Sequence, residues 1–208
     1  MLKLMSWNVN TYINKDNLLY RLQIITEEII KISPDILFIQ EAGNELLDIL
    51  RKKYTLSDSV LTHGGLCCIL TKPHLGSYES IKFDTTGVGI ISQDSILVNC
   101  HLVPYKNNSE YRKYQLNEIV KNNKDKKITF IGDMNMKDDE TYTSFKDVAV
   151  EVNDNTPTWN LSYFKQGSTI RKRFDRIYTN QPFSNYKVYS NLSGISDHLP
   201  LSIMINFS

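Results

Sequence analysis

KITFIGDMN, residues 127–135, carries the strongest structural signal in this sequence. Its run of β-branched and aromatic residues, Ile128–Ile131, predicts a strand that is buried on both faces. The run stops at Gly132, and a carboxylate and an amide follow at once, Asp133 and Asn135. Ligand sites in α/β proteins collect where strands end, because the loops there are free of core packing. This stretch therefore predicts a buried strand that delivers polar side chains to a site.

The same pattern recurs along the chain, because five more strand-like segments end in, or carry, acids, amides or histidines. The residues concerned are Asn8, Glu41, His101, Asp175, Asp197 and His198. Taken alone, each has an ordinary explanation, since Asn is common in turns, an acid often starts a helix and a single histidine is often a core residue. Six such endings in one chain favour a shared site instead.

The chemical character of this set indicates which cation it suits. With Asp133 and Asn135 it supplies two amides, four carboxylates and two imidazoles. Carboxylate and amide oxygens, with water, are the ligands that Mg²⁺ prefers, whereas the Cys and His clusters of a zinc site are missing. The three cysteines, Cys67, Cys68 and Cys100, lie in apolar runs and are expected to be small core residues in a reducing compartment.

Helical periodicity appears in three places. Residues 16–31 and 109–120 carry apolar residues at helical spacing and predict amphipathic helices, and residues 44–52 are expected to form a short helix. Asp16 is the expected N-cap of the first helix, and Pro34 is expected to end it. The remaining periodic segments are strand-like, and we expect strands at residues 2–7, 35–41, 65–72, 87–92, 95–102, 127–133, 173–180, 187–190 and 200–207.

The arrangement of these segments predicts the fold class. Strands outnumber helices, and a strand–helix–strand pattern occurs twice, in residues 2–41 and 95–133. We therefore predict an α/β fold, a four-layer α/β/β/α sandwich of two packed mixed sheets. A chain of 208 residues is long enough for one well-buried core, and no linker or low-complexity segment divides it, so we expect one domain over residues 1–208.

The charge balance limits how a phosphate could be bound. The formal net charge is only +1, so binding would depend on local patches and metal rather than on a global field. The clearest basic patch is Arg171, Lys172 and Arg173, whereas the lysines of residues 124–127 are expected to form a solvated turn. No signal peptide and no apolar run of about 20 residues is visible, so we expect an intracellular protein, nuclear or cytoplasmic and not secreted, without a membrane partner.

Two other enzyme classes are disfavoured. Ser196, Asp197 and His198 have the residue types of a hydrolase triad, but they are contiguous, and neighbours in an extended segment point to opposite faces. The Gly-x-Ser-x-Gly elbow of serine hydrolases and the glycine-rich phosphate loop of P-loop enzymes are also absent.

An ordered series of short motifs resembles a known family. SWNVN (6–10), IQE (39–41), CHL (100–102), GDMN (132–135), RFDRI (173–177) and SDHLPL (196–201) together resemble the endonuclease/exonuclease/phosphatase, or DNase I-like, family from end to end. Any one of these motifs is weak, but the ordered series is specific. The resemblance implies the same sandwich fold and a metal-dependent phosphodiesterase.

Within this family, the 5′-tyrosyl-DNA phosphodiesterase group has the most similar local motifs. Four stretches of this chain are similar to segments of that group: GDMNMKDDE (132–140), TPTWN (156–160), KRFDRIY (172–178) and YRKYQL (111–116). Two positions depart from the group: Val103 and Pro104 stand where it has Glu-Ser, and Lys137 replaces an arginine. Lysine keeps the charge there but loses bidentate phosphate geometry.

The resemblance implies a metal site. Glu41 would be the direct Mg²⁺ ligand, Asp197 would lie close to the metal and its waters, and Asn8 would support both metal and phosphate. Mn²⁺ is expected to substitute for Mg²⁺.

The resemblance also implies catalytic roles. Asp133 would orient and deprotonate the attacking water, and Asn135 would bond the phosphate. His198 would stabilise charge on the phosphate oxygens, with Asp175 holding its ring. His101 would contact the phosphate or the leaving oxygen.

The substrate that the resemblance implies is a nucleic acid with a 5′-linked tyrosine at a single-stranded end, and we expect the protein to act as a monomer. Arg112, Lys137, Trp159 and Arg173 are the expected substrate contacts, and for Trp159 partial packing is an equally good expectation. The reaction would leave a 5′-phosphate on DNA, in DNA repair, and an RNA 5′ end presents the same linkage. The alternatives are an abasic-site endonuclease or general DNase, a lipid phosphodiesterase of the same family, and a non-catalytic binding module.

Overall fold

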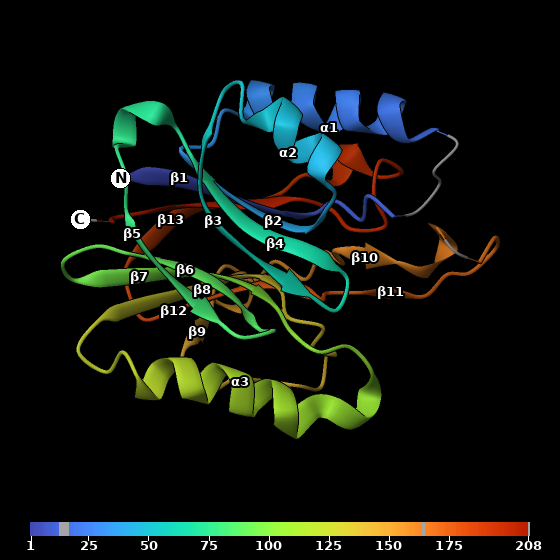
Figure 1. The fold of residues 1–208 in the computed structure, drawn as a ribbon. Coiled ribbons are helices and arrows are strands. Elements are labelled where there is room, and N and C mark those ends of the chain that lie inside the picture. Colours follow the sequence, from blue (N-terminus) through green and yellow to red (C-terminus); the bar gives the residue numbers. More distant parts are fainter. Residues whose placement is uncertain (13–16, 164, 208) are drawn as a thin grey trace.

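The computed structural model describes residues 1–12, 17–163 and 165–207. Two six-stranded sheets pack face to face, and helices cover both outer faces (Figure 1). The four-layer α/β/β/α sandwich of mixed sheets that the sequence predicts is therefore confirmed. The expected N-cap at Asp16 lies outside the described residues.

The first sheet has the strand order β13-β14-β1-β2-β4-β3, with β1 and β2 parallel and the other pairs antiparallel. The helices α1 and α2 cover its outer face, at the top of Figure 1. The bounds are β1 Leu2–Asn8, α1 Leu18–Ile32, β2 Ile36–Ala42, α2 Asn44–Leu50, β3 Thr55–Thr62, β4 Gly65–Thr71, β13 Phe183–Val188 and β14 Leu201–Ile205.

The second sheet has the order β5-β6-β7-β8-β12-β9, with β7 and β8 parallel. The helix α3 covers its outer face, at the bottom of Figure 1. The bounds are β5 Glu79–Phe83, β6 Gly87–Ile91, β7 Ser95–His101, α3 Ser109–Lys121, β8 Lys127–Asp133, β9 Lys146–Asp147, α4 Val148–Glu151 and β12 Asp175–Thr179. A separate two-stranded ribbon joins β10 Trp159–Asn160 to β11 Arg171–Lys172.

Three apolar clusters fill the spaces between the four layers. Leu22, Ile25 and Ile29 of α1 pack with residues of β1 and β2 beneath the first pair of helices. Phe38 of β2 and Ile131 of β8 belong to the cluster between the two sheets. The third cluster joins α3 to the second sheet. The strands that the sequence predicts to be apolar on both faces are thus buried on both faces.

A polar link crosses the interior between the two sheets. The amide of Gln40, on β2, donates to Asn99 Oδ1 on β7 at 2.6 Å. Asn99 in turn donates to the carbonyl oxygens of Ile39 and Cys68, at 3.0 and 2.7 Å. Near this link, a Cβ on Gly132 would lie 2.1 Å from the Cys100 carbonyl oxygen, and Gly132 has φ +142°, so glycine is required there.

Two long strands, β3 and β5, were not expected from the sequence, nor were the two-residue strands β9, β10 and β11. Most residues of both long strands are only half-buried or exposed, so their sequences lack the apolar runs of the inner strands. The three cysteines are buried and unpaired, as expected of core residues. Among the described residues, no helix is long and apolar enough to cross a membrane.

Candidate active site

Strand register brings the predicted polar residues to one edge of the sandwich. In the second sheet His101 pairs with Asp133 across the β7–β8 ladder, and Asp133 pairs with Asp175 across β8–β12. In the first sheet Asn8 ends β1, and Glu41 lies near the end of the parallel strand β2. Both sheets therefore contribute side chains to one site.

Asn8 connects the two sheets at the centre of this site. Its Nδ2 donates to Glu41 Oε1 and to Asp133 Oδ2, each at 3.0 Å, and its Oδ1 accepts the backbone N–H of Asn10 at 3.1 Å. Asn8 is fully buried. In this orientation its amide nitrogen holds the two carboxylates, and its oxygen faces away from them.

Burial and crowding raise the proton affinity of Glu41. Its backbone lies in the left-handed region, with φ 54°. Desolvation raises the pKa of Glu41 from 4.5 to about 7; the Asn8 hydrogen bond and His198 oppose this rise, and the charges of Asp133 and Asp197 add to it. A carboxylate held among other carboxylates is stabilised by a bound cation, so the donor set fits a divalent metal ion.

His198 and Asp175 form a buried ion pair. His198 Nδ1 lies 2.8 Å from Asp175 Oδ2, and His198 Nε2 lies 3.7 Å from both Asp133 Oδ2 and Asp197 Oδ2. Burial opposes charging of His198, but Asp175, Asp133 and Asp197 outweigh it and raise the pKa of His198 well above its usual value. Burial raises the pKa of Asp175 to about 6, against the effect of His198.

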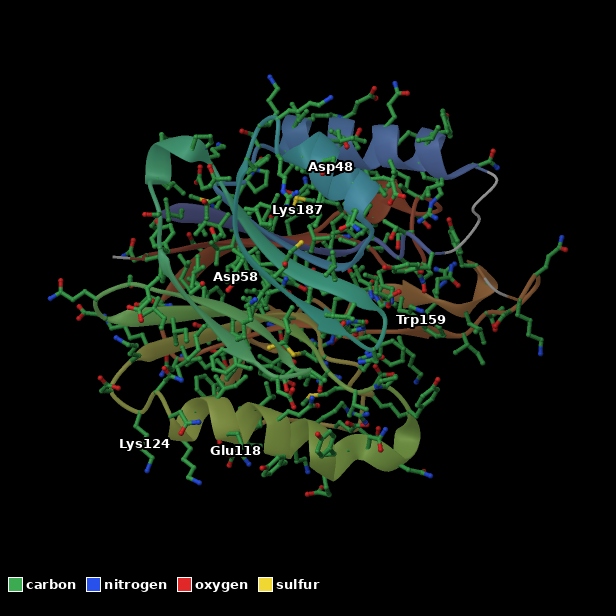
Figure 2. The ribbon with its side chains drawn as sticks, viewed as in Figure 1. Asp48, Asp58, Glu118, Lys124, Trp159 and Lys187 are labelled. Atoms are coloured by element: carbon green, nitrogen blue, oxygen red, sulfur yellow. The ribbon has the colours of Figure 1, made fainter. Side chains whose placement is uncertain are left out.

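Asp197 accepts side-chain hydrogen bonds on both of its carboxylate oxygens. The indole Nε1 of Trp159 donates to Asp197 Oδ2 at 3.0 Å, and Asn10 Nδ2 donates to Asp197 Oδ1 at 3.1 Å. The Trp159 ring also packs on Phe174, with centroids 5.0 Å apart. Trp159, labelled in Figure 2, lies on the β10 side of the molecule, and a pocket of about 320 Å³ that includes Arg171 opens beside it. Trp159 therefore combines partial packing with support of a site carboxylate.

Asn135 turns back toward Asp133. It has φ 49°, and its backbone N–H donates to Asp133 Oδ1 at 2.9 Å. Its side-chain amide donates to the Leu102 carbonyl oxygen at 3.0 Å. The side chain is half-buried, and it is the backbone of Asn135 that contacts the Asp133 carboxylate.

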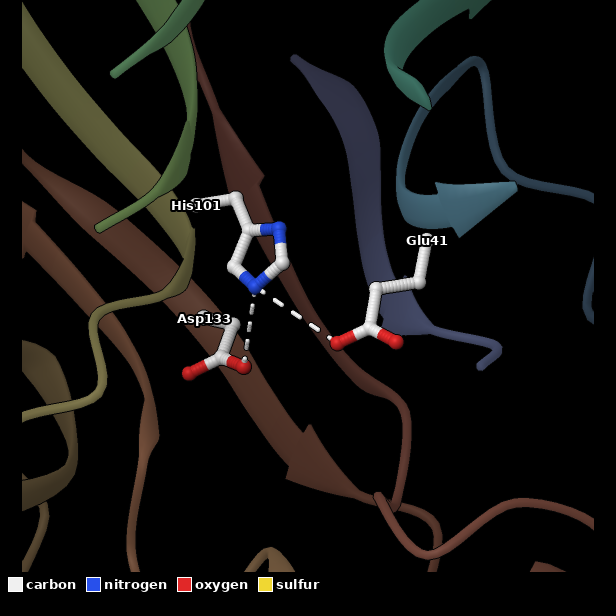
Figure 3. A group of neighbouring side chains, drawn as sticks. All are labelled: Glu41, His101 and Asp133. Carbon is white, nitrogen blue, oxygen red and sulfur yellow. Dashed lines mark ion pairs between the residues drawn. The ribbon is translucent and has the colours of Figure 1, made fainter. Parts of the chain in front are cut away.

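The turn between β3 and β4 forms a wall of the site that the sequence did not reveal. Thr62 Oγ1 lies 2.9 Å from His101 Nδ1, and the His63 and His101 rings lie 4.2 Å apart between centroids. A Cβ on Gly64 would lie 2.7 Å from His101 Cε1 and 2.9 Å from Glu41 Cδ. Figure 3 shows that His101 Nε2 faces Glu41 and Asp133, at 3.6 and 3.7 Å from their nearest oxygens.

The structure does not present Arg112 as a phosphate contact. Its side chain is fully buried, forms an ion pair with Glu140, and donates to the carbonyl oxygens of Val103 and Tyr105 at 3.0 and 2.8 Å. No sequence signal pairs Arg112 with Glu140, which lies 28 positions further along the chain. Arg112 instead fixes the loop that follows Asn135.

Arg173 and Lys137 differ in how they are engaged. Arg173 bonds both oxygens of Asp147 at 2.9 Å, so its guanidinium fork is already occupied. Within the described residues, the Lys137 side chain has no ion pair or hydrogen bond, and its carbonyl oxygen accepts from Arg176. Of the four expected substrate contacts, Lys137 and Trp159 thus remain candidates, because Arg112 and Arg173 are engaged by acids.

Comparison with known families identifies the chain. Residues 5–198 match the family described as the Endonuclease/Exonuclease/phosphatase family. The chain belongs to this family. The membership that the ordered motifs predict is thereby confirmed.

Among curated members of the endonuclease/exonuclease/phosphatase family, two tyrosyl-DNA phosphodiesterases are similar to the chain. The 5′-tyrosyl-DNA phosphodiesterase of Caenorhabditis briggsae is 26% identical over 223 residues, which cover 93% of this chain and 63% of the relative. Tyrosyl-DNA phosphodiesterase 2 of Gallus gallus is 25% identical over 205 residues, covering 84% of this chain and 55% of the relative. The chain spans less than two thirds of the length of either relative.

Solved structures of the family share the fold. Truncated Caenorhabditis elegans TDP2 superimposes with a TM-score of 0.74 at 23% identity, over 97% of this chain and 96% of that one. D. rerio TDP2 complexed with a single-strand DNA product gives a TM-score of 0.77 at 23% identity, over 99% of both chains. These likenesses establish the architecture of the sandwich.

Proposed function

We propose that this chain is a Mg²⁺-dependent phosphodiesterase that hydrolyses the bond between a tyrosine and the 5′ end of DNA. The products would be a free tyrosine or tyrosyl peptide and a 5′-phosphate end, which gives the activity a role in DNA repair. An RNA 5′ end carries the same linkage and is a chemically equivalent substrate.

The main support for the proposal is that amide, carboxylate and imidazole side chains from both sheets lie together in one cluster. Asn8 bonds Glu41 and Asp133 together, and His198 Nε2 lies 3.7 Å from Asp133 Oδ2. In-line hydrolysis of a phosphodiester needs a group that activates water and groups that neutralise the phosphate oxygens. Both kinds of group are present within one cluster.

Asp133 is suited to activate the attacking water. One of its oxygens accepts from Asn8 and the other from the backbone of Asn135. These bonds fix the carboxylate plane, and a fixed carboxylate beside the phosphate acts as a general base. No covalent enzyme intermediate is needed, because water can attack directly.

His198 is suited to stabilise the negative charge on the phosphate. The surrounding carboxylates raise the pKa of His198 well above its usual value despite its burial, which favours the positively charged form of the ring. Asp175 holds the ring by Nδ1, so Nε2 is the nitrogen directed into the cluster. Donors fixed in advance of the reaction lower the barrier because they do not reorganise during it.

A divalent cation held by Glu41, with Asp197 nearby, would neutralise charge on the phosphate and on the leaving oxygen. Glu41 is partly accessible, with 18% of its side chain exposed, while Asp133 and His198 are almost fully buried. A cation can therefore reach the cluster from the Glu41 side.

The tyrosyl substrate is supported by chemistry and by likeness. A tyrosine hydroxyl has a pKa of about 10, so a tyrosyl group leaves more readily than a sugar hydroxyl and needs less acid catalysis. The two curated relatives are tyrosyl-DNA phosphodiesterases. The motif residues Glu140 and Arg176, which the chain shares with that group, organise the loop after Asn135.

The test is cleavage of a single-stranded oligonucleotide with a 5′-phosphotyrosine, with Mg²⁺ or with EDTA. An abasic duplex, an unmodified strand and a sphingomyelin vesicle are assayed beside it, and His198→Ala serves as the inactive control. Mg²⁺-dependent release of tyrosine with little internal cutting is the expected result.

Other outcomes would replace the proposal. Cutting of the abasic or unmodified strand would make the chain an endonuclease of the same family. Turnover of the lipid alone would make it a lipid phosphodiesterase. Absence of turnover on all four substrates, in protein whose fold is intact by circular dichroism, would make it a binding module.

A further inference from the structure

A groove of about 300 Å³ lies beside the β7 end of the active site. It opens between the turn that joins β5 to β6 and the helix α3, on the outer side of the second sheet. The lining residues that matter for its chemistry are Lys82, Asp84, Thr86, Tyr111, Tyr114 and Glu118. Glu118, labelled in Figure 2, lies on α3.

Hydrogen bonds attach the wall of this groove to the strand end that bears His101. The backbone N–H of His101 donates to the carbonyl oxygen of Thr86 at 2.9 Å, and the Thr86 hydroxyl accepts from Gln115 Nε2 at 3.0 Å. Gln115 Oε1 in turn accepts the N–H of Val103, two residues after His101, at 3.3 Å. Thr86 and Gln115 are both buried. The groove is therefore separated from the active site by a single residue, Thr86.

Exposed tyrosine rings gather along the groove. Tyr111 and Tyr114 are 50% and 55% exposed, and their stacked rings lie 6.0 Å apart between centroids. Tyr105, in the loop between His101 and α3, is 80% exposed, and its carbonyl oxygen accepts from Arg112 at 2.8 Å. Large exposed rings that cluster in one place, on backbone that is held in position, are typical of an interaction site.

The charges of the groove suit a cation and not a phosphate. Asp84 and Glu118 supply two carboxylates to the lining. The ammonium group of Lys82 lies 3.2 Å from Asp58, which does not line the groove, and Lys121 makes only an exposed contact with Glu118 at 3.8 Å. A lysine or arginine beside tyrosine faces and carboxylates is attracted by both, whereas a nucleic-acid strand is negative at every phosphate.

The pocket beside Trp159 has a cationic residue in its lining instead, Arg171, and it reaches the site at Asp197. A tyrosyl substrate has two arms on its phosphorus, a polyanionic strand and a polypeptide. Arg171 favours the strand in the pocket beside Trp159. The groove beside His101, with its carboxylates and tyrosines, then matches the polypeptide arm.

We propose that the groove formed by Asp84, Tyr111, Tyr114 and Glu118 binds the polypeptide attached to the substrate tyrosine, through a lysine or arginine of that polypeptide. The inference deepens the proposed function and rests on it for the nature of the substrate. An extended polypeptide advances about 3.3 Å per residue, so a basic residue a few positions from the tyrosine can reach a groove that adjoins His101.

The test compares three oligonucleotides that differ only in the group on the 5′-phosphate. One bears tyrosine alone, one a short peptide with lysines on both sides of the tyrosine, and one the same peptide with glutamates in place of the lysines. We expect kcat/KM for the lysine peptide to exceed that for tyrosine alone by about 5-fold at low ionic strength, mainly through KM. The glutamate peptide should be the poorest of the three, and high salt should reduce the differences.

Charge reversal gives the matched variants. Asp84→Lys together with Glu118→Lys is expected to invert the order, so that the glutamate peptide becomes the preferred one. Tyr111→Ala together with Tyr114→Ala should abolish the gain from the lysine peptide. Glu110→Lys makes the same charge change at an exposed position of α3 that does not line the groove, and it should keep the wild-type order. Equal kcat/KM for the lysine and glutamate peptides in the wild type, or an unchanged order in the charge-reversed variant, would overturn the inference.

Peptide binding without turnover separates this inference from the proposed function. The free lysine peptide, with no nucleic acid attached, is titrated into the protein, and the tyrosine ring signals are followed by NMR, with the alanine variants as assignments. Shifts at Tyr111 and Tyr114 would support the inference even if no tyrosyl oligonucleotide were cleaved, an outcome that would count against the proposed function alone. Shifts of these two rings with an unmodified oligonucleotide, and none with the peptide, would make the groove a nucleic-acid contact and overturn the inference.

Discussion

His198 Nδ1 lies 2.8 Å from Asp175 Oδ2, and the second oxygen of that carboxylate, Oδ1, is buried without a hydrogen-bond partner among the described residues. An acid in such a position depends on its histidine, because His198 is the charged partner that offsets the burial of the carboxylate. The pair therefore acts as one unit, in which Asp175 holds the ring and keeps it charged.

Asp175→Asn preserves the shape of this pair and removes its charge. Asp175 is the first of the carboxylates that raise the pKa of His198 against burial, so the variant should lose the imidazolium as the pH rises through the neutral range. We expect kcat at pH 8 to fall by about 100-fold or more, with a smaller loss at pH 6. The pH–rate profile measures this. A profile parallel to that of the wild type would contradict the positioning role of Asp175.

Glu41→Gln should stabilise the metal-free protein at alkaline pH. The pKa of Glu41 is about 7 in the folded protein and 4.5 as its usual value, so the folded state binds the proton more tightly. The contribution of Glu41 to stability is then greatest below pH 4.5, falls between pH 4.5 and 7, and is lowest above pH 7. We expect the variant to exceed the wild type by roughly 3 kcal/mol at pH 8 and by little at pH 5. Urea unfolding in EDTA at the two pH values tests the sign; a wild type that gains stability with rising pH relative to the variant would refute it.

Mg²⁺ should stabilise the wild-type protein at the alkaline pH at which ionised Glu41 destabilises the metal-free protein. A cation that binds the ionised Glu41 relieves the repulsion from Asp133 and Asp197 and stabilises the folded state by mass action. We expect Mg²⁺ to raise the Tm of the wild type at pH 8 by more than at pH 5, and to leave the Tm of Glu41→Gln nearly unchanged. An equal rise in both proteins would place the cation elsewhere.

Trp159→Phe should separate the two contacts of this side chain. Phenylalanine can keep the packing on Phe174 but cannot donate to Asp197 Oδ2. We expect a loss of about 1 kcal/mol in the free energy of unfolding and a lower kcat, because Asp197 loses one of the donors that orient it. Trp159→Ala, which removes both contacts, is the comparison. If Trp159→Phe matches the wild type in kcat and only Trp159→Ala is impaired, packing alone explains the residue.

Arg112→Gln should destabilise the fold instead of weakening nucleic-acid binding. It leaves Glu140 unpaired in the interior, and breaking a buried ion pair in this way costs about 3–5 kcal/mol. Lys113→Gln, on the same helix, removes an exposed ion pair with Glu110 and should change stability by less than about 1 kcal/mol. Thermal unfolding with oligonucleotide binding to the folded protein distinguishes these effects. Weaker DNA binding at unchanged stability would restore Arg112 as a phosphate contact.

The sequence revealed the elements that are buried on both faces and the residues at their ends. The run before Asp133 predicted β8 because every position from Ile128 to Gly132 is buried, and the alignment of β7 with β8 then follows from the parallel pairing. The half-exposed strands β3 and β5 have no such run, so they were missed. The turn that begins with Thr62 was missed with them.

The other differences between the sequence predictions and the structure come from residues whose contacts lie far apart in the sequence. Arg112 has the residue type and motif position of a phosphate contact, and only the fold shows that Glu140 already occupies it. His63 lay in a segment without periodicity, yet it packs against His101 because β3 and β7 end side by side at the site. Pairings of this kind depend on the docking of two sheets and leave no local pattern in the chain.

The inter-sheet position of the site joins catalysis to assembly. Asn8 and Glu41 come from one layer and Asp133, His101 and Asp175 from the other, so neither sheet alone contains the complete active site. A cation or phosphate bound by residues of both layers would link the two sheets, and its binding free energy would add to the free energy that stabilises their packing. Hydrogen exchange at the interface between the sheets should therefore be slower with metal and a 5′-phosphate oligonucleotide bound than in the free protein.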